Sequence, residues 1–287
     1  MNDSTAFQAI LNDWSLPVPF TIALAVFAAL YFAGWRRIRR TRPAQFPAWR
    51  LASFEAGLAI FWLAVASPMD GLADALLSAH MVEHLLLMNV VPPLVLLGAP
   101  IVPLLRGLPR WFQRFVFGFF FRRRGLRNLV FALTRPLPAW LLMNLTFLAW
   151  HLPAAYDFAL ENEFWHSVEH LCFFSTCLLF WGCLLRPWPA RQQSLGWMVI
   201  PYLVGSDIVN TIVSASLAFC GRPVYLFYAA HPNPFCVSLL DDQVLGAAIM
   251  WVVGSLIFLG PAMILIVRLF ERQHAPLAEH SFPMQWR

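Results

Sequence analysis

LLSAHMVEHLLLMNVVPPLVLL, residues 76–97, is an almost unbroken apolar run that carries His80, Glu83 and His84 near its start. An α-helix needs about 20 such residues to cross a lipid bilayer. The same H-x-x-E-H motif returns at residues 166–170, again at the head of a long apolar run. Residues four apart share one face of a helix, so each motif directs two imidazoles the same way with a carboxylate close by. Because these side chains are costly inside a bilayer, both motifs predict a functional site.

The composition places the whole chain in a membrane. Of its 287 residues, 60% are hydrophobic and only 12% are charged, and the mean hydropathy is +0.63. A soluble domain of this length is far less apolar. The long runs lack the alternation of barrel strands, which indicates helices. The sequence therefore predicts an all-α protein, a polytopic membrane bundle of seven transmembrane helices.

Seven apolar runs are the expected spans. They cover residues 17–35, 51–66, 76–97, 137–150, 165–185, 196–217 and 243–267. Together they form one membrane domain, residues 17–267, between a polar outer arm at residues 1–16 and a tail at residues 268–287. Pro92 and Pro93 are expected to bend the third run. The arm has no basic residue ahead of the first run, so a cleaved signal peptide is not expected.

Arginine marks the orientation of the chain. The formal net charge is +5, and the basic residues lie between the apolar runs. Such clusters are typical of cytoplasmic loops rather than of a nucleic-acid site. Every arginine except Arg222 falls on one side if the N-terminus is outside and the C-terminus is cytoplasmic. On this topology both H-x-x-E-H motifs lie near the outer face, and the segment 98–135, rich in arginine and aromatic residues, lies in the cytoplasmic interface.

A weak internal repeat relates the two motifs. The second and third runs, and the fourth and fifth, form outward hairpins that turn at Pro68 and Asp70 and at Pro153 and Asp157. Each hairpin then re-enters the membrane at an H-x-x-E-H motif. The sixth and seventh runs place Asp-Asp-Gln, residues 241–243, at the corresponding point. We expect three related hairpins around one site at the outer face.

Paired imidazoles of this kind indicate a transition-metal site. Neutral histidine binds copper, zinc, iron or nickel, and a carboxylate can join as a ligand or orient an imidazole. The expected ligands are the four motif histidines, His80, His84, His166 and His170. The supplementary candidates are Glu83, Glu169, His151 and Asp242.

Other interpretations of the motifs stay open. H-x-x-E-H is also the inverted zinc-protease motif, in which the glutamate activates water. Histidines from different helices can be the axial ligands of haem. The same side chains can form a hydrogen-bond network that needs no metal. Met81 and Met88 lie close by and would favour Cu(I), although methionine is also ordinary packing in apolar helices.

Asp207 and Asn210 put two polar groups on one face of the sixth run, at a depth where an unpaired charge is expensive. They could relay protons. A buried partner, Asn144 or Asn89, is the competing expectation.

Cys220 and Cys236 share the last outer loop. In an oxidising compartment they could form a disulfide that closes a loop of about 17 residues. The alternative is that they remain free thiols able to carry copper.

Several segments resemble the CtaG family of cytochrome c oxidase assembly proteins. They are SAHMVEHLLLM at residues 78–88, PP at 92–93, LGAP at 97–100, WHLP at 150–153, YD at 156–157, the motif at 166–170, and DQ at 242–243 with Gly246 and Met250-Trp251. The resemblance covers approximately residues 66–260, most of the chain.

This resemblance implies a seven-helix protein needed to make active haem–copper oxidase, commonly supposed to help copper reach it. It implies a non-enzymatic, copper-binding assembly factor of the bacterial inner membrane. Its partners would be the catalytic subunit of the oxidase and a periplasmic copper donor. The alternatives are an intramembrane zinc hydrolase, a haem-binding oxidoreductase, and a metal-free scaffold that docks through residues 111–127.

Overall fold

The computed structural model describes residues 17–185, 187, 196–230 and 235–278, and across these residues the chain is helical with no strand. Six of the described helices are long and apolar enough to cross a membrane, and a seventh crossing is obtained if one bent pair counts as a single span. The predicted all-α membrane bundle is confirmed. The sidedness of the two termini stays a prediction, and the arm at residues 1–16 lies outside the described residues.

Most spans coincide with the predicted runs. They are α2 (Val18–Arg39), α3 (Ala48–Ala66), the stretch Leu77–Leu97, α12 (Glu163–Leu185), η2 (Gly196–Met198) with α13 (Val199–Phe219), and α15 (Leu239–Ala278). The last differs most, because α15 is 40 residues long and continues well beyond residue 267. Arginine does not end a helix; it only marks where a helix leaves the apolar layer.

The fourth predicted span is shorter than a bilayer. Helix α10 (Pro136–Trp150) has 15 residues, which is about 22 Å at 1.5 Å per residue. It follows α9 (Arg124–Leu133) through a bend of 74°. Proline disfavours a helical conformation in the residue before it, and Arg135 is accordingly extended. The bend therefore lies where the sequence interrupts the helix.

The stretch Leu77–Leu97 is a single span that becomes irregular just before its prolines, and the predicted bend there stays a prediction. It consists of α5 (Leu77–Leu85), a π-helical turn η1 (Leu86–Val90) and α6 (Val91–Leu97). Pro92 has no N–H to donate to the carbonyl of Met88, four residues earlier. The indole N–H of Trp181 on α12 donates to that carbonyl instead, at 3.1 Å. The irregularity thus ties the stretch to α12.

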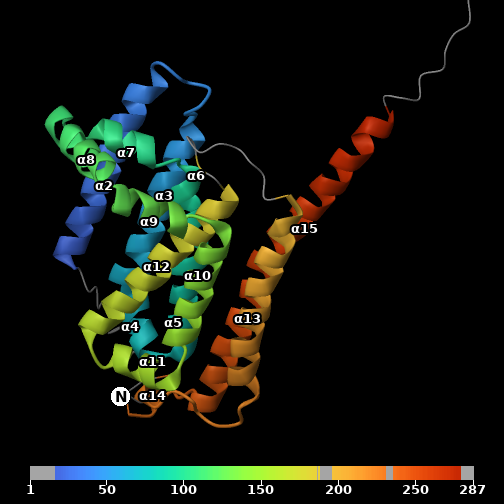
Figure 1. Ribbon diagram of the computed structural model, residues 1–287. Helices are drawn as coiled ribbons and strands as arrows, with labels where there is room; N and C mark the ends of the chain where they lie inside the picture. The colour runs from blue at the N-terminus through green and yellow to red at the C-terminus, as the bar shows by residue number, and fades with distance from the viewer. Residues whose placement is uncertain (1–16, 186, 188–195, 231–234, 279–287) are drawn as a thin grey trace, which may run out of the picture.

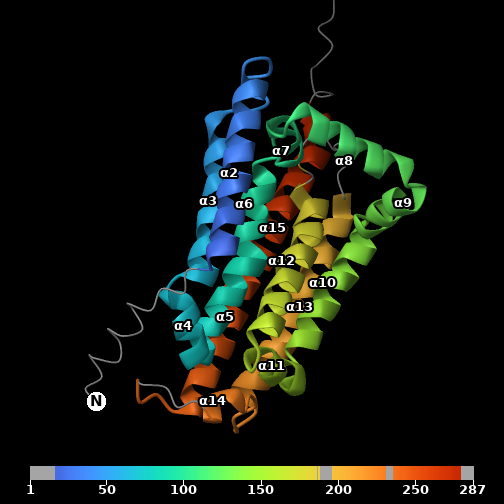
Figure 2. The ribbon, with the colours of Figure 1, turned by 90° about the vertical axis from the view of Figure 1, so that its left-hand side faces the viewer.

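Short helices cover one end of the bundle. Helices α4 (Pro68–Ala75), α11 (Pro153–Leu160) and α14 (Phe227–Ala230) lie together there, at the bottom of Figures 1 and 2. The predicted turn at residues 67–71 is the beginning of α4, where the Ser67 hydroxyl accepts a hydrogen bond from the Met69 N–H at 3.2 Å. Both H-x-x-E-H motifs open helices at this same end.

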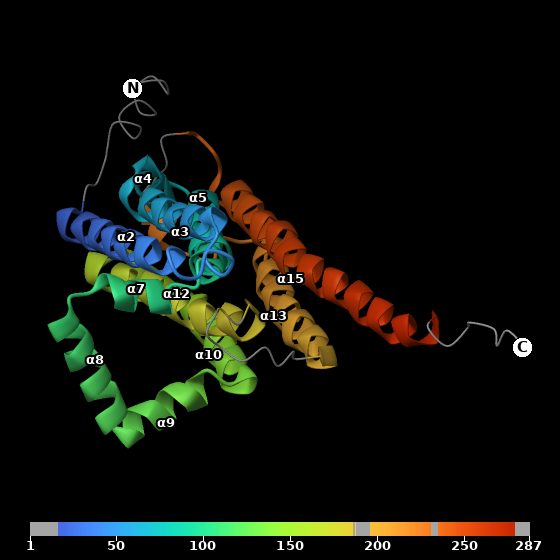
Figure 3. The same ribbon diagram turned by 90° about the horizontal axis from the view of Figure 1, so that it is seen from above.

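The opposite end carries α7 (Ile101–Gly107) and α8 (Arg110–Arg122). Seen from above, α8 and α9 form an arm that stands away from the other helices (Figure 3). Trp111 and Phe115 on α8 are 71% and 65% exposed, and α9 buries no residue. An amphipathic arm with exposed aromatic rings suits the predicted position in the cytoplasmic interface, which stays a prediction.

The remaining helices pack around two cores. Helices α2, α3 and α6 enclose one around Tyr31, whose hydroxyl donates to the Gly98 carbonyl at 2.7 Å. A larger core lies between the motif helices, α10, α13 and α15, and contains Phe173 and Phe180. Cys220 and Cys236 are both exposed and free among the described residues, so of the two alternatives the structure has the free thiols rather than the disulfide.

Candidate metal centre

The two H-x-x-E-H motifs meet in space. His80 and His84 extend from α5, and His166 and His170 extend from α12. The ring centroids of His80 and His166 are 5.2 Å apart, and those of His84 and His170 are 5.6 Å apart. Within each motif the two rings are 4.2 Å apart. The sequence placed both pairs at one membrane depth, and the structure brings them into a single cluster.

The glutamates cross over between the motifs. His84 Nε2 lies 3.7 Å from Glu169 Oε1, and His170 Nε2 lies 3.6 Å from Glu83 Oε1. The last histidine of each motif therefore faces the glutamate of the other. This reciprocal arrangement gives the cluster an approximate two-fold symmetry, which agrees with the predicted repeat of the first two hairpins.

The cluster is buried and its polar atoms are unsatisfied. Glu83 and His80 are fully buried, and Glu169 is 1% exposed. Both nitrogens of His80 and His84 and both carboxylate oxygens of each glutamate have no hydrogen-bond partner in the part of the chain that the structure describes. Nearly all buried polar groups in folded proteins are hydrogen-bonded, because an unpaired one costs free energy. So many unpaired lone pairs in one place are typical of a site that a bound ion completes.

Two overlapping sets of side chains are close enough to share an ion. Among the described residues these sets are His80, His166 and His170, and His80, His84 and Glu169. The ligand atoms of each set lie within 4.8 Å of one another. His80 belongs to both sets. Nitrogen ligands with one carboxylate are the donors that copper and zinc take in proteins, so the residues fit such a metal.

Asp242 lies beside the cluster but has another role. Its oxygens accept hydrogen bonds from the Leu77 N–H at 2.7 Å, from the Ser78 N–H at 3.2 Å, and from the Ser78 hydroxyl. It therefore caps the N-terminus of α5 from α15. Gly246, one turn further along α15, makes the approach possible: a Cβ there would lie 3.2 Å from the Ser78 Cα. Asp242 is outside both sets of ligand atoms.

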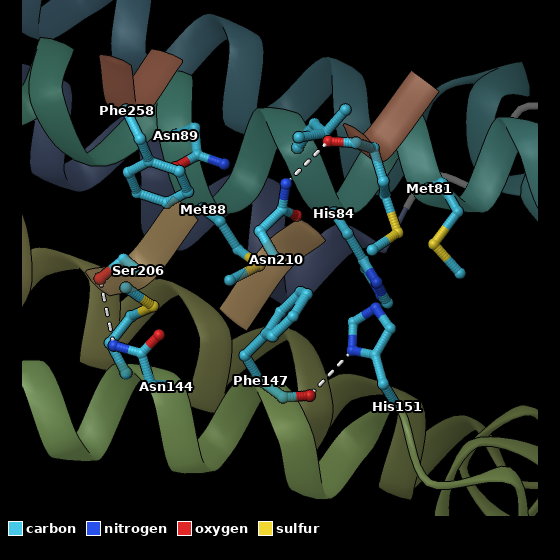
Figure 4. Close-up of a pocket in the computed structure, with 13 residues that line it drawn as sticks. Met81, His84, Met88, Asn89, Asn144, Phe147, His151, Ser206, Asn210 and Phe258 are labelled. Carbon is cyan, nitrogen blue, oxygen red and sulfur yellow. Dashed lines mark hydrogen bonds between the residues drawn. The ribbon is translucent and has the colours of Figure 1, made fainter. Parts of the chain in front are cut away.

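His151 lies on the inner side of the cluster. Its ring centroid is 6.1 Å from that of His84. Its Nδ1 is 2.8 Å from the Phe147 carbonyl oxygen, which assigns the proton to Nδ1. Its Nε2 is buried and has no partner among the described residues. His151 thus keeps one lone pair available, toward His84 (Figure 4).

Three tyrosines that sequence reasoning missed close the outer side of the cluster. The ring of Tyr156 lies 5.3 Å from that of His80 and stacks on Tyr225 at 3.9 Å. The hydroxyls of Tyr156 and Tyr228 are 3.1 Å apart, and Tyr228 also donates to the Ala73 carbonyl at 3.0 Å. Burial raises the pKa of Tyr228 well above its usual value, so it is a neutral donor. Tyr156 alone had a signal in the sequence, because it belongs to the YD segment at residues 156–157 that resembles the CtaG family.

Asn210 does not pair with Asn144 or Asn89. It donates to the Met250 carbonyl at 3.1 Å, across to α15. Asn144 donates to the Ser206 hydroxyl at 3.2 Å. These bonds join α10 to α13 and α13 to α15, deeper in the bundle than the cluster.

A comparison with known protein families shows which family the chain belongs to. The family model described as cytochrome c oxidase caa3 assembly factor (Caa3_CtaG) matches residues 29–272. The chain belongs to this family. The matched segment contains both H-x-x-E-H motifs and His151, so the whole cluster lies within the residues that the family model matches.

Individual relatives are more distant. Uncharacterized proteins of Mycobacterium bovis and Mycobacterium tuberculosis are each 25% identical over 273 residues, which is 91% of this chain and 39% of theirs. The chain thus spans about two fifths of the length of these curated relatives. No solved structure matches it.

Proposed function

We propose that this assembly factor binds copper at the cluster of α5 and α12 and passes it to the catalytic subunit of a haem–copper oxidase. The observation that carries the proposal is the reciprocal set of buried histidines and glutamates with unpaired lone pairs. The oxidase is named as the recipient because the family that the chain belongs to is described as a cytochrome c oxidase assembly factor. Copper is here the cargo rather than a resident cofactor.

The proposed roles follow from position. His80 would hold the ion in either ligand set, because it belongs to both. His84 and Glu169 would complete one set, and His166 and His170 the other. Glu83 would orient His170, since its carboxylate faces that imidazole at 3.6 Å. Asp242 is not part of the proposed ligand set, because both of its oxygens already accept hydrogen bonds.

Release of the ion is built into the same geometry. A transfer protein should not enclose its metal in one rigid cage. Two overlapping sets that share His80 let the ion exchange ligands one at a time. His166 is the one motif histidine that is partly exposed, so we place the entry and exit there. The arginine distribution supports a location of this end at the periplasmic face of a bacterial inner membrane, where a copper donor and the oxidase would meet it.

The test is elemental analysis of the purified full-length protein in detergent, after loading with copper under reducing conditions. The wild-type protein should retain copper, and His80→Ala with His84→Ala should lose it. His274→Ala, far along the chain, is the control and should retain it. Wild-type protein with no copper would overturn the proposal. Bound zinc, or a Soret band from haem, would instead support the hydrolase or the oxidoreductase.

One observation favours a second candidate, a scaffold that works by contact. The arm of α8 and α9 exposes Trp111 and Phe115 and carries several arginines, which gives it the character of a docking surface. If contact alone suffices, deletion of residues 110–133 should stop oxidase assembly in cells while the double histidine variant assembles normal amounts of oxidase. The copper proposal expects the double variant to fail.

A further inference from the structure

A small cavity adjoins the cluster on the side away from the short helices. It lies between the motif helix α5, with η1, and helices α10, α13 and α15. Its open volume is about 20 Å³. A cavity of this size holds one water or one monatomic ion, and it is far smaller than the pockets that hold organic cofactors.

Methionine is the most frequent residue type in the lining of this cavity. Four of the nine methionines in the sequence contribute, and they come from three helical segments: Met81, Met88, Met143 and Met250. All four are buried. The remaining methionines with a described side chain, such as Met198 and Met263, are 66% and 63% exposed. Methionine is therefore concentrated at this point rather than spread through the core.

The polar groups of the cavity divide into two kinds. Asn144 and Asn210 donate to Ser206 and to the Met250 carbonyl, so their amides fix helices. His151 and His84 differ, because each keeps a ring nitrogen that is buried and unpartnered among the described residues. Figure 4 shows these two imidazoles directed toward one another, with Met81 and Met88 on either side of His84.

The tautomer of His151 leaves its Nε2 lone pair able to bind a metal ion. The bond from Nδ1–H to the Phe147 carbonyl leaves the lone pair on Nε2. A metal-binding histidine typically donates its other ring N–H in this way, to a carbonyl or carboxylate that orients the ring. Packing alone does not call for an imidazole with one nitrogen fixed and the other bare.

We propose that the cavity is a second metal site, selective for Cu(I), formed by His151 Nε2 and the thioethers of Met88 and Met250 and joined to the cluster through His84. Thioethers are soft ligands that select Cu(I) over zinc or Cu(II). The proposal goes beyond the cargo site, because it assigns a separate ion to residues that belong to neither ligand set of the cluster. No redox step is involved, since the ion enters and leaves as Cu(I).

Position gives the second site a use. The cluster lies toward the short helices, and the cavity lies deeper in the same bundle. His84 lines the cavity and also belongs to one ligand set of the cluster. An ion can therefore move between the two by exchanging the other ligands around His84. The protein would hold one ion in reserve while another is exchanged at His166.

The test uses the full-length protein in detergent without oxygen, with Ag(I) as a redox-inert substitute for Cu(I) and Zn(II) as the harder ion. Met88→Leu with Met250→Leu keeps side-chain volume nearly constant. We expect this variant to lose one Ag(I) site, with affinity at least about 100-fold weaker, because two direct ligands are removed and even an outer-shell change costs 10–100-fold. Its Zn(II) binding should equal that of the wild type.

Met198→Leu with Met263→Leu is the matched control and should bind Ag(I) as the wild type does. X-ray absorption of the Cu(I)-loaded wild-type protein provides a readout that needs no variant, and it should show sulfur beside nitrogen ligands. A spectrum without sulfur, or unchanged Ag(I) binding in the double variant, would overturn the second site and leave the cargo site standing. His80→Ala should give the opposite result, with Zn(II) binding lost and one Ag(I) still bound through sulfur. That result would support two separate sites.

Discussion

Two buried polar groups at the same end of the bundle behave in opposite ways. Asp242 and Gln243 on α15 are 3% and 2% exposed, as deeply buried as the glutamates of the cluster. Yet Gln243 accepts from the Val224 N–H at 2.7 Å and donates to the Leu217 carbonyl at 2.9 Å, and Asp242 caps α5. By contrast, both carboxylate oxygens of Glu83 and Glu169 and both ring nitrogens of His80 and His84 have no hydrogen-bond partner among the described residues. Burial alone therefore does not mark the candidate site; the concentration of buried polar atoms without hydrogen bonds sets the cluster apart from Asp242 and Gln243.

The difference has a physical origin in what surrounds each group. Asp242 faces the N-terminus of a helix, where free N–H groups and the helix dipole both favour a carboxylate. Glu83 and Glu169 project from the sides of helices whose own N–H groups are already used, so only side chains reach them. Those side chains are imidazoles, which also lack partners. A bound cation, as proposed, would satisfy both kinds of side chain.

The largest effect on stability is expected for Asp242, whose oxygens accept hydrogen bonds from the start of α5. Asp242→Ala leaves the Leu77 and Ser78 N–H groups buried without acceptors, and each such group costs about 1–3 kcal/mol. We expect the free energy of unfolding to fall by about 2–4 kcal/mol, seen as a lower midpoint in thermal unfolding in detergent. The copper content of the folded fraction should not change.

Asp241→Ala is the control for that variant. Asp241 is exposed and bonds only to the neighbouring Ser238 among the described residues. Its replacement should shift stability by no more than about 0.5 kcal/mol. If Asp242→Ala removed copper and left stability intact, Asp242 would be a ligand as the sequence suggested. It would then belong with the cluster rather than with the structural groups.

A substitution in the cluster should lower copper affinity without lowering stability, the reverse of Asp242→Ala. Glu169→Gln keeps the shape of the side chain but removes its charge. We expect copper affinity to fall about 10–100-fold, as for other changes that alter ligand or orienting carboxylates. The metal-free protein should be as stable as the wild type or more stable, because an uncompensated buried carboxylate is lost. Competition with a chromogenic chelator and thermal unfolding of the metal-free protein measure the two quantities.

Glu83→Gln tests the symmetry of the cluster. The two glutamates face equivalent histidines at 3.6 and 3.7 Å, but only Glu169 belongs to a ligand set. The effect on affinity should therefore be smaller for Glu83→Gln than for Glu169→Gln. A loss of stability in the metal-free form of either variant would mean that the cluster is a structural hydrogen-bond network.

Much of the fold could be predicted from the sequence, because hydropathy and proline report local preferences. The fifth apolar run, 165–185, differs from α12 by two residues at its start. The fourth run, 137–150, matches α10 to within one residue, but the bend that joins α10 to α9 was not predicted. The end of α15 was also missed, because leaving the apolar layer and ending a helix are separate events.

The candidate site was predictable in composition but not in connectivity. Spacing placed the two imidazoles of each motif on one face of a helix. The crossing of Glu83 to His170 and of Glu169 to His84 depends on how α5 and α12 are rotated against each other, which tertiary packing decides. Asp242 was a candidate ligand for the same reason: its charge was visible in the sequence, and the helix end that it caps was not.

The smallest effect concerns the tyrosines between the two polar groups. Tyr228→Phe removes the hydroxyl that donates to the Ala73 carbonyl and meets Tyr156. One hydrogen bond is worth about 1 kcal/mol of unfolding free energy, and copper affinity should change less than about threefold. Burial raises the pKa of Tyr228 in the folded state, so this contribution is fully present below the unfolded pKa of about 10 and is lost as pH rises above it. Thermal unfolding of wild type and variant should therefore differ at neutral pH and converge above about pH 10. A large loss of copper in Tyr228→Phe would show that Tyr156 positions His80, and it would place the tyrosines with the unsatisfied cluster rather than with the structural cap.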